Sequence, residues 1–120
     1  MPDQQTTVLE LRELMQEFVA QRQWERFHNP KNLAMGLVIE GAELMEHFQW
    51  LDLPASADLV EKPEARSAIA DEIADVACYV LALVNVMHLD LSTAVRAKMA
   101  KNQQKYPAEE YRGRYEKPKH

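Results

Sequence analysis

The sequence predicts an all-α protein, and three observations support that prediction. Apolar residues recur at helical spacing along most of the chain, no segment shows the period-two alternation of a half-buried strand, and prolines and capping residues separate segments of helical length. The chain has 120 residues, of which 47% are hydrophobic, and this is enough for one domain with its own core. We therefore expect a four-helix bundle.

Caps and helix breakers place the four helices at about residues 7–27, 30–51, 63–87 and 91–106. Thr6 or Thr7 is expected to cap the first helix, and Asn29 to cap the second, with Pro30 at its first position. The first helix should end near residue 27, because the residue before a proline disfavours helix.

Prolines also delimit the second half of the chain. They mark residues 52–63 as a loop, after which the third helix begins at Pro63 or Glu64. Asp90 or Ser92 is expected to cap the fourth helix, which Pro107 ends. Residues 1–107 should thus form the domain, and the basic residues 108–120 a flexible C-terminal tail.

Charge is distributed unevenly around a net value of −5. Residues 1–90 hold 6 Lys or Arg against 16 Asp or Glu, whereas residues 91–120 hold 8 against 3. The acidic body argues against nucleic acid as a partner. The basic segment can hold the phosphates of a small ligand, although a solvated tail would have the same composition.

Cysteine content and hydropathy indicate the compartment. Cys78 is the only cysteine, so an internal disulfide is excluded and a reducing setting is indicated. The chain starts "MPDQQTTVLELRELMQE", which is polar and acidic, unlike a secretory signal peptide. The most apolar run, residues 76–89, is shorter than the about 20 residues that span a bilayer. We expect a cytoplasmic protein with no membrane partner.

Four acids stand on two expected helices that are otherwise apolar. Glu40 and Glu43 are three residues apart, and so are Glu72 and Asp75, which puts each pair on one helix face. Residues 32–50 contain no Lys or Arg, and crowded carboxylates without compensation are unfavourable. One E-x-x-E alone is usually a solvent-facing stripe. Two matching pairs on neighbouring helices favour a metal site.

The acids suggest which metal the site would hold. An all-carboxylate set suits Mg²⁺ or Mn²⁺ rather than zinc or iron. Di-iron bundles need a Glu-x-x-His on each of two helices, and here only Glu25 and His28 have this spacing. Magnesium held by protein carboxylates most often grips a phosphate chain. The spacing therefore indicates a magnesium site for a phosphorylated substrate.

Four sequence blocks carry a resemblance to a known family. The stretches "WERFHNPKNL", "EGAELMEHFQW", "DEIADVACYV" and "KMAKNQQKYP" resemble, in this order, the MazG-like all-α nucleoside triphosphate pyrophosphatases, and within them the dCTP pyrophosphatase branch. The resemblance covers roughly residues 9–107. It implies Mg²⁺-dependent hydrolysis of a nucleoside triphosphate to the monophosphate and pyrophosphate, in a homo-oligomer of helical subunits.

The resemblance also assigns roles to individual residues. The metal ligands would be Glu40, Glu43, Glu72 and Asp75. The base and sugar pocket would be lined by Trp24, His28 and Trp50, with Tyr79 facing the same site. The phosphates would be contacted by Lys98, Asn102, Lys105 and Tyr106, with Lys31 at the entrance to the second helix. Met15 stands where the branch carries a histidine near the base, and Lys101 where it carries an acid, so cytosine selectivity stays open.

The expected reaction is in-line attack of water on the α-phosphorus. Glu43 or Glu46 would accept the proton, and Lys98 and Lys105 would stabilise the departing pyrophosphate. Two other functions stay open. One is a phosphoribosyl-ATP-type pyrophosphohydrolase of related fold, and the other is a non-enzymatic helical regulator or partner-binding protein that keeps the acids.

The third expected helix predicts the oligomeric state. Its apolar residues cannot share one face: Ile69, Ile73, Val76, Val80, Leu81, Leu83, Val84, Val86 and Met87. A helix of a monomeric bundle buries a single stripe, and a large apolar remainder favours association. We therefore expect a homodimer or a homotetramer built as a dimer of dimers.

Overall fold

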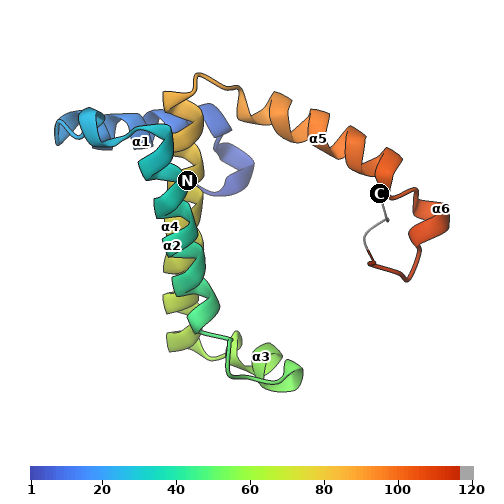
Figure 1. Ribbon diagram of the computed structural model, residues 1–120. Helices are drawn as coiled ribbons and strands as arrows, with labels where there is room; N and C mark the ends of the chain where they lie inside the picture. The colour runs from blue at the N-terminus through green and yellow to red at the C-terminus, as the bar shows by residue number, and fades with distance from the viewer. Residues whose placement is uncertain (117–120) are drawn as a thin grey trace. The chain divides into compact units, whose positions relative to one another are not determined.

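The computed structural model describes residues 1–116, and every element of regular structure in that range is helical (Figure 1). The α-helices are α1 (Val8–Gln21), α2 (Pro30–Glu46), α3 (Leu53–Leu59), α4 (Pro63–Val86), α5 (Leu91–Lys105) and α6 (Ala108–Tyr111). Two short 3-10 helices accompany them, η1 (Asp3–Gln5) and η2 (Glu25–Phe27). The all-α prediction is confirmed, and α1, α2, α4 and α5 correspond to the four expected helices.

Side-chain caps fix where the long helices begin. Thr7 and Glu10 form a capping box on α1, in which the Thr7 hydroxyl oxygen accepts a hydrogen bond from the Glu10 backbone N–H at 3.1 Å. The Asn29 side chain accepts one from the backbone N–H of Asn32 at 2.9 Å, and Asp90 caps α5 in the same way. The predicted caps Thr7, Asn29 and Asp90 are therefore confirmed.

Helix C-termini depart from the prediction. The first helix ends at Gln21 rather than near residue 27, because Gln23 adopts a left-handed φ of 54°. The Trp24 N–H donates to the Val19 carbonyl and the Gln23 N–H to the Ala20 carbonyl, which is the Schellman pattern that closes a helix. The second helix likewise ends at Glu46, not near residue 51, and turns follow it.

Two short helices lie where the sequence predicted none. Residues 52–63 were expected to form a loop, which is wrong, because the Asp52 side chain caps α3 and Pro54 occupies its second position. The expected tail, residues 108–120, contains α6 at its start. Residues 117–120 of that tail lie outside the described residues.

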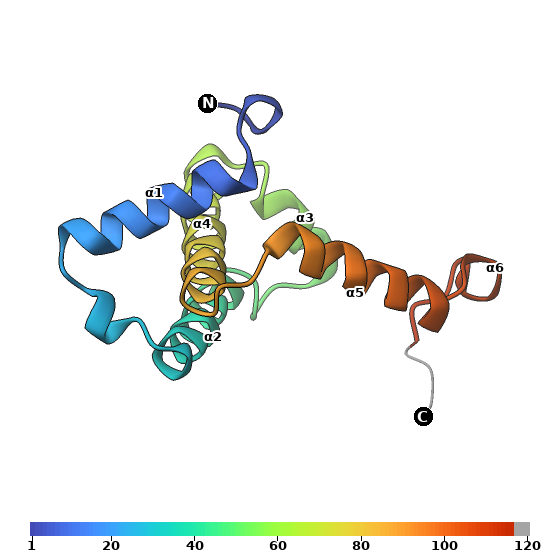
Figure 2. The ribbon, with the colours of Figure 1, turned by 90° about the horizontal axis from the view of Figure 1, so that it is seen from above.

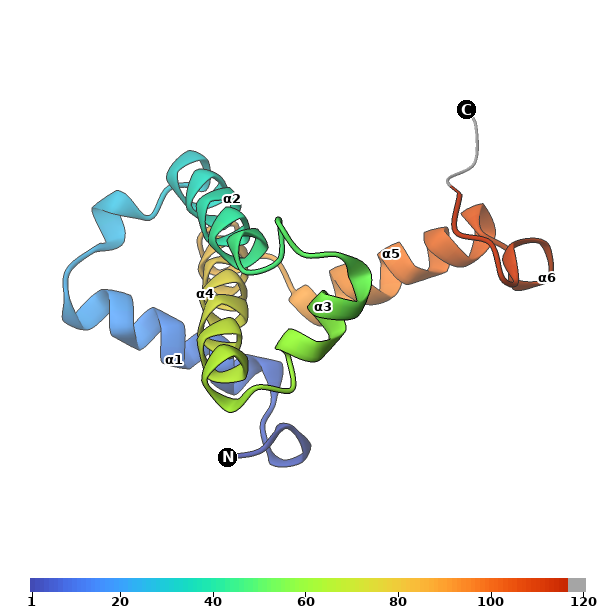
Figure 3. The same cartoon turned by 90° about the horizontal axis from the view of Figure 1, so that it is seen from below.

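The helices form two compact units, which divide between His88 and Leu89. In the first unit, α2 and α4 lie side by side and run in opposite directions, and α1 packs across the C-terminal part of α4 (Figure 2, Figure 3). Among residues 1–116 the buried apolar side chains are few: Val19, Leu33, Ile69, Ala82 and Val84. Many large apolar side chains stay exposed, so α4 with its two neighbours buries only a small core.

The second unit contains α5 and α6. The rings of Tyr106 and Tyr111 meet edge to face, with centroids 5.2 Å apart, and hold α6 against the end of α5. The Lys105 ammonium lies 5.5 Å from the Tyr106 ring centroid.

Over the described chain as a whole, none of the helices combines the length and the apolar character needed to cross a bilayer.

Candidate active site

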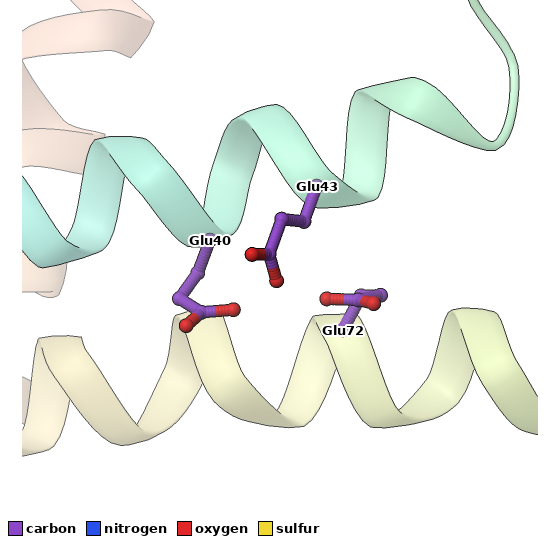
Figure 4. Close-up of side chains that lie close together, drawn as sticks. All are labelled: Glu40, Glu43 and Glu72. Atoms are coloured by element: carbon purple, nitrogen blue, oxygen red, sulfur yellow. The ribbon is translucent and has the colours of Figure 1, made fainter.

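Three of the four predicted metal ligands converge between α2 and α4 (Figure 4). Glu40, Glu43 and Glu72 each offer a carboxylate oxygen, and these oxygens lie within 4.8 Å of one another. Glu40 and Glu43 project from one helix toward Glu72 on the other. Asp75 is not part of this close group, but its negative charge acts on Glu40 and both residues line the same cavity.

Burial and mutual repulsion make the charged forms of these acids unfavourable. One carboxylate oxygen of Glu40 and one of Glu72 are buried without a hydrogen-bond partner. Burial raises the pKa of Glu40, and a hydrogen bond with Glu43 and the charges of Glu43, Asp75 and Glu72 raise it further. No Lys or Arg within residues 1–116 forms an ion pair with any of the four acids. The closest basic atom is Nε2 of His47, 3.8 Å from Oε1 of Glu72.

The donor set fits a hard divalent cation. Buried carboxylate oxygens without partners are costly, and a cation between them would supply the missing partner. All ligand atoms of the group are carboxylate oxygens, which Mg²⁺ and Mn²⁺ accept and which structural zinc sites seldom use alone. The arrangement can therefore hold a metal ion where α2 faces α4.

A cavity of about 640 Å³ adjoins the acids. Glu40 and Asp75 contribute to its wall, and the remaining lining is mostly apolar or aromatic: Leu11, Leu14, Met15, Phe18, Trp24, His28, Cys78, Tyr79 and Leu81. Burial, and then the charge of Asp75, raises the pKa of the Cys78 thiol, so Cys78 contributes a neutral wall. This combination of an apolar chamber and an acidic edge suits a ligand with a flat organic part and a cation-bound charged part.

Three of the residues predicted to bind a base meet in this cavity. In the turn after α1 lies Trp24, in the turn before α2 lies His28, and on α4 lies Tyr79. All three side chains line the cavity. The Trp24 ring packs edge to face on Phe18, with centroids 5.7 Å apart. The Arg22 guanidinium lies 3.7 Å from the centroid of the Phe18 ring and thereby covers its outer face.

Other predicted residues lie elsewhere. Trp50 is 88% exposed in the turn after α2, Lys31 is exposed in the first turn of α2, and Glu46 is exposed and outside the close acid group. None of these three lines the cavity. The predicted phosphate contacts belong to the second unit, on α5 and its C-cap: Lys98, Asn102, Lys105 and Tyr106. Their roles stay predictions.

The sequence reasoning missed most of the wall that α1 contributes. Leu11, Leu14, Met15 and Phe18 recur at helical spacing on α1, and of these only Met15 was singled out from the sequence. The spacing itself was the available signal, but a stripe that faces a cavity has the same period as one that faces other side chains.

Comparisons with known proteins agree with this geometry. The rat (Rattus norvegicus) dCTP pyrophosphatase 1 is 42% identical over 107 residues, which are 89% of this chain and 63% of that protein. The human (Homo sapiens) dCTP pyrophosphatase 1 is 41% identical over 102 residues, 85% of this chain and 60% of that one. The chain thus spans less than two thirds of the length of these relatives.

A solved structure and a family model extend the comparison. The crystal structure of a pyrophosphatase from Archaeoglobus fulgidus DSM 4304 matches with a TM-score of 0.79 and 37% identity, covering 89% of this chain and 98% of that chain. The model of the MazG-like family matches residues 36–119, a range that contains all four acids. The predicted resemblance, including that to the dCTP pyrophosphatases, is confirmed. This chain belongs to the MazG-like family.

Proposed function

We propose that the protein is a Mg²⁺-dependent nucleoside triphosphate pyrophosphohydrolase, which can also use Mn²⁺. It cleaves a (deoxy)nucleoside triphosphate, dCTP or a modified dCTP, to the monophosphate and pyrophosphate. The observation that carries this proposal is that Glu40, which has a buried, unpartnered carboxylate oxygen and is grouped with Glu43 and Glu72, lines a cavity together with Trp24 and Tyr79. The relatives described above, a dCTP pyrophosphatase and a pyrophosphatase, are named for the same reaction class.

In this reaction the acids hold the metal and the cavity holds the base. Glu40, Glu43, Glu72 and Asp75 would bind the cation, which supplies positive charge to the triphosphate and makes a neighbouring water more acidic. Glu43 is the better placed of the two proposed bases, because it belongs to the close acid group whereas Glu46 does not.

The apolar chamber has a role of its own. The rings of Trp24 and Tyr79 give a nucleobase flat surfaces to stack on, and His28 offers ring nitrogens for its edge. A base seated there excludes water from the acidic edge and so strengthens the electrostatic interactions made at that edge. The phosphates would be contacted by four residues of the second unit: Lys98, Asn102, Lys105 and Tyr106.

The exposed apolar surface supports a homodimer or a homotetramer. Within the first unit, large apolar side chains that are more than half exposed recur on α1, α2 and α4: Leu9, Leu14, Met35, Val38, Ile39, Met45 and Ile73. Exposed apolar side chains on three helices favour association, and a second copy of the chain would cover them. Light scattering should give a multiple of 13.9 kDa, and an active species of 13.9 kDa would contradict the proposal.

The reaction is tested by identifying its products. The purified protein is incubated with Mg²⁺ and a panel of nucleoside triphosphates, with phosphoribosyl-ATP in the same panel, and the products are separated by anion-exchange chromatography. We expect a nucleoside monophosphate and pyrophosphate in equal amounts. A nucleoside diphosphate or free orthophosphate would exclude the reaction, turnover of phosphoribosyl-ATP alone would assign the related hydrolase, and no turnover would favour a regulatory role.

A further inference from the structure

Gly36 occupies an interior position of α2 that does not need glycine for its backbone. It lies in the second turn of a regular helix, and positive φ angles are found elsewhere, at Gln23, His88 and Gly113. Glycine destabilises a helix interior relative to alanine, so its presence at this position calls for a packing reason.

The packing reason is the aromatic ring of Tyr79 on α4. A Cβ atom at residue 36 would lie 2.3 Å from Cε1, 2.7 Å from Cζ and 2.9 Å from Cδ1 of that ring. The edge of the ring therefore occupies the space that any larger side chain at residue 36 would need. Gly41, on the same helix, has no atom within 4 Å of the corresponding position.

Tyr79 is also part of the cavity wall, so its position sets the space inside the cavity. With alanine at residue 36, the ring would have to withdraw by about 1 Å to reach ordinary carbon–carbon contact. The cavity is open space that the ring already adjoins, so a ring displaced from α2 is expected to move into it. The missing Cβ at Gly36 keeps the chamber wide.

We infer that Gly36 is a specificity-determining residue, which sets the largest base that the cavity accepts by seating Tyr79 against α2. This inference rests on the proposed function, because it takes the cavity to be the base site. Gly36 itself acts through Tyr79 and does not touch the base. Its effect should therefore grow with the size of the base substituent and should be small on the chemical step, which takes place at the acids.

The kinetic test uses a series of substrates that differ in size. Gly36→Ala and Gly41→Ala are compared with the unchanged protein on dCTP and on dCTP analogues with increasingly large 5-substituents. For Gly36→Ala we expect KM to rise with substituent size, reaching about 10-fold or more for the largest, with kcat nearly unchanged, because small volume changes in apolar pockets discriminate on this scale. Gly41→Ala should leave the size dependence as it is. If Gly36→Ala changed KM by the same factor for all substrates, relative to the unchanged protein, the inference would be overturned.

A second test does not depend on activity. The melting temperature is measured for Gly36→Ala alone and in a Tyr79→Ala background, with Tyr79→Val as the background if the first is unfolded. Without the ring, alanine at residue 36 should raise the melting temperature by about 4 °C, as expected for removing a helical glycine. With the ring, this gain should be lost or reversed. An equal gain in both backgrounds would refute the seating of Tyr79, whereas an absence of any nucleotide turnover by the unchanged protein would refute only the proposed function.

Discussion

Arg12 and Asn85 form a clamp that joins α1 to the last turn of α4. The Arg12 Nε–H donates to Oδ1 of Asn85 at 2.9 Å, Nη2 of Arg12 donates to the Val84 carbonyl at 3.4 Å, and Nδ2 of Asn85 donates back to the Arg12 carbonyl at 3.0 Å. These bonds are partly buried and connect residues 72 or 73 positions apart. Because α1 and α4 both line the cavity, we expect the clamp to hold the wall that α1 contributes in place against α4.

Replacing Asn85 with Ala removes two of these three bonds. One of them involves a charged donor, and such bonds contribute about 1.5–3 kcal/mol, against about 0.5–1.5 kcal/mol for a neutral one. The clamp is only partly buried, so we take the lower end of the sum and expect a loss of about 2 kcal/mol in the free energy of unfolding. For a chain of this size, the melting temperature should fall by about 8 °C.

The assay combines thermal unfolding with kinetics. In Asn85→Ala, KM for the nucleotide should rise more than kcat falls, because the acids stand on α2 and α4 and their grouping does not involve α1. Arg66→Ala is the matched control: it removes a single exposed bond, from Nη1 to the Val60 carbonyl at 3.2 Å, and should change stability by less than about 0.5 kcal/mol. If Asn85→Ala were as stable as this control and had an unchanged KM, the clamp would neither stabilise the fold nor shape the cavity.

Two further predictions concern the acids. The folded pKa of Glu40 is raised above 4.5, so its contribution to stability is fully present below pH 4.5 and is lost as the pH rises through the folded value. The metal-free protein should therefore melt higher at pH 5 than at pH 8, and Glu40→Gln should weaken this dependence; a flat profile in the unchanged protein would contradict it. Asp75→Ala should keep its helical circular dichroism but lose at least about 100-fold in activity. It should also lose the gain in free energy of unfolding that Mg²⁺ gives, which is roughly 2.7 kcal/mol at 100 times the Kd. Full activity and full Mg²⁺ stabilisation in this variant would remove Asp75 from the site.

Local signals explain which parts of the fold could be predicted. Thr7, Asn29 and Asp90 are caps because each side chain bonds to a backbone N–H three residues later, and such short-range chemistry is visible in the sequence. The end of α1 depends instead on Gln23 in a left-handed conformation, for which a glutamine gives no signal. Pro54 was read as a loop residue, although it is equally suited to the first turn of a helix.

The same distinction holds for the site. The spacing of the acid pairs predicted that each pair shares a helix face, and the structure brings three of the four acids together. Arg12 and Asn85 have no local pattern that links them, since their contact depends on how α1 crosses α4. The exposed position of Trp50 could not be predicted either, because an aromatic residue after a helix packs inside some folds and outside others.

The seam between α2 and α4 contains both the acid group and the contact that seats Tyr79 in the cavity wall. Because these helices run in opposite directions, residues one turn apart on α2 face residues one turn apart on α4, in the pairs Gly36 with Tyr79, Glu40 with Asp75, and Glu43 with Glu72. The contact that sets the width of the cavity therefore lies one turn from the acids, on the same two rigid helices. A shift of α2 along α4 would disturb both features, because each is made by residues of the two helices, whereas α1 can change the opposite wall without disturbing the acids. Substitutions in α1 and at Gly36 should accordingly alter which base is accepted, whereas substitutions of the acids should alter whether a triphosphate is cleaved at all.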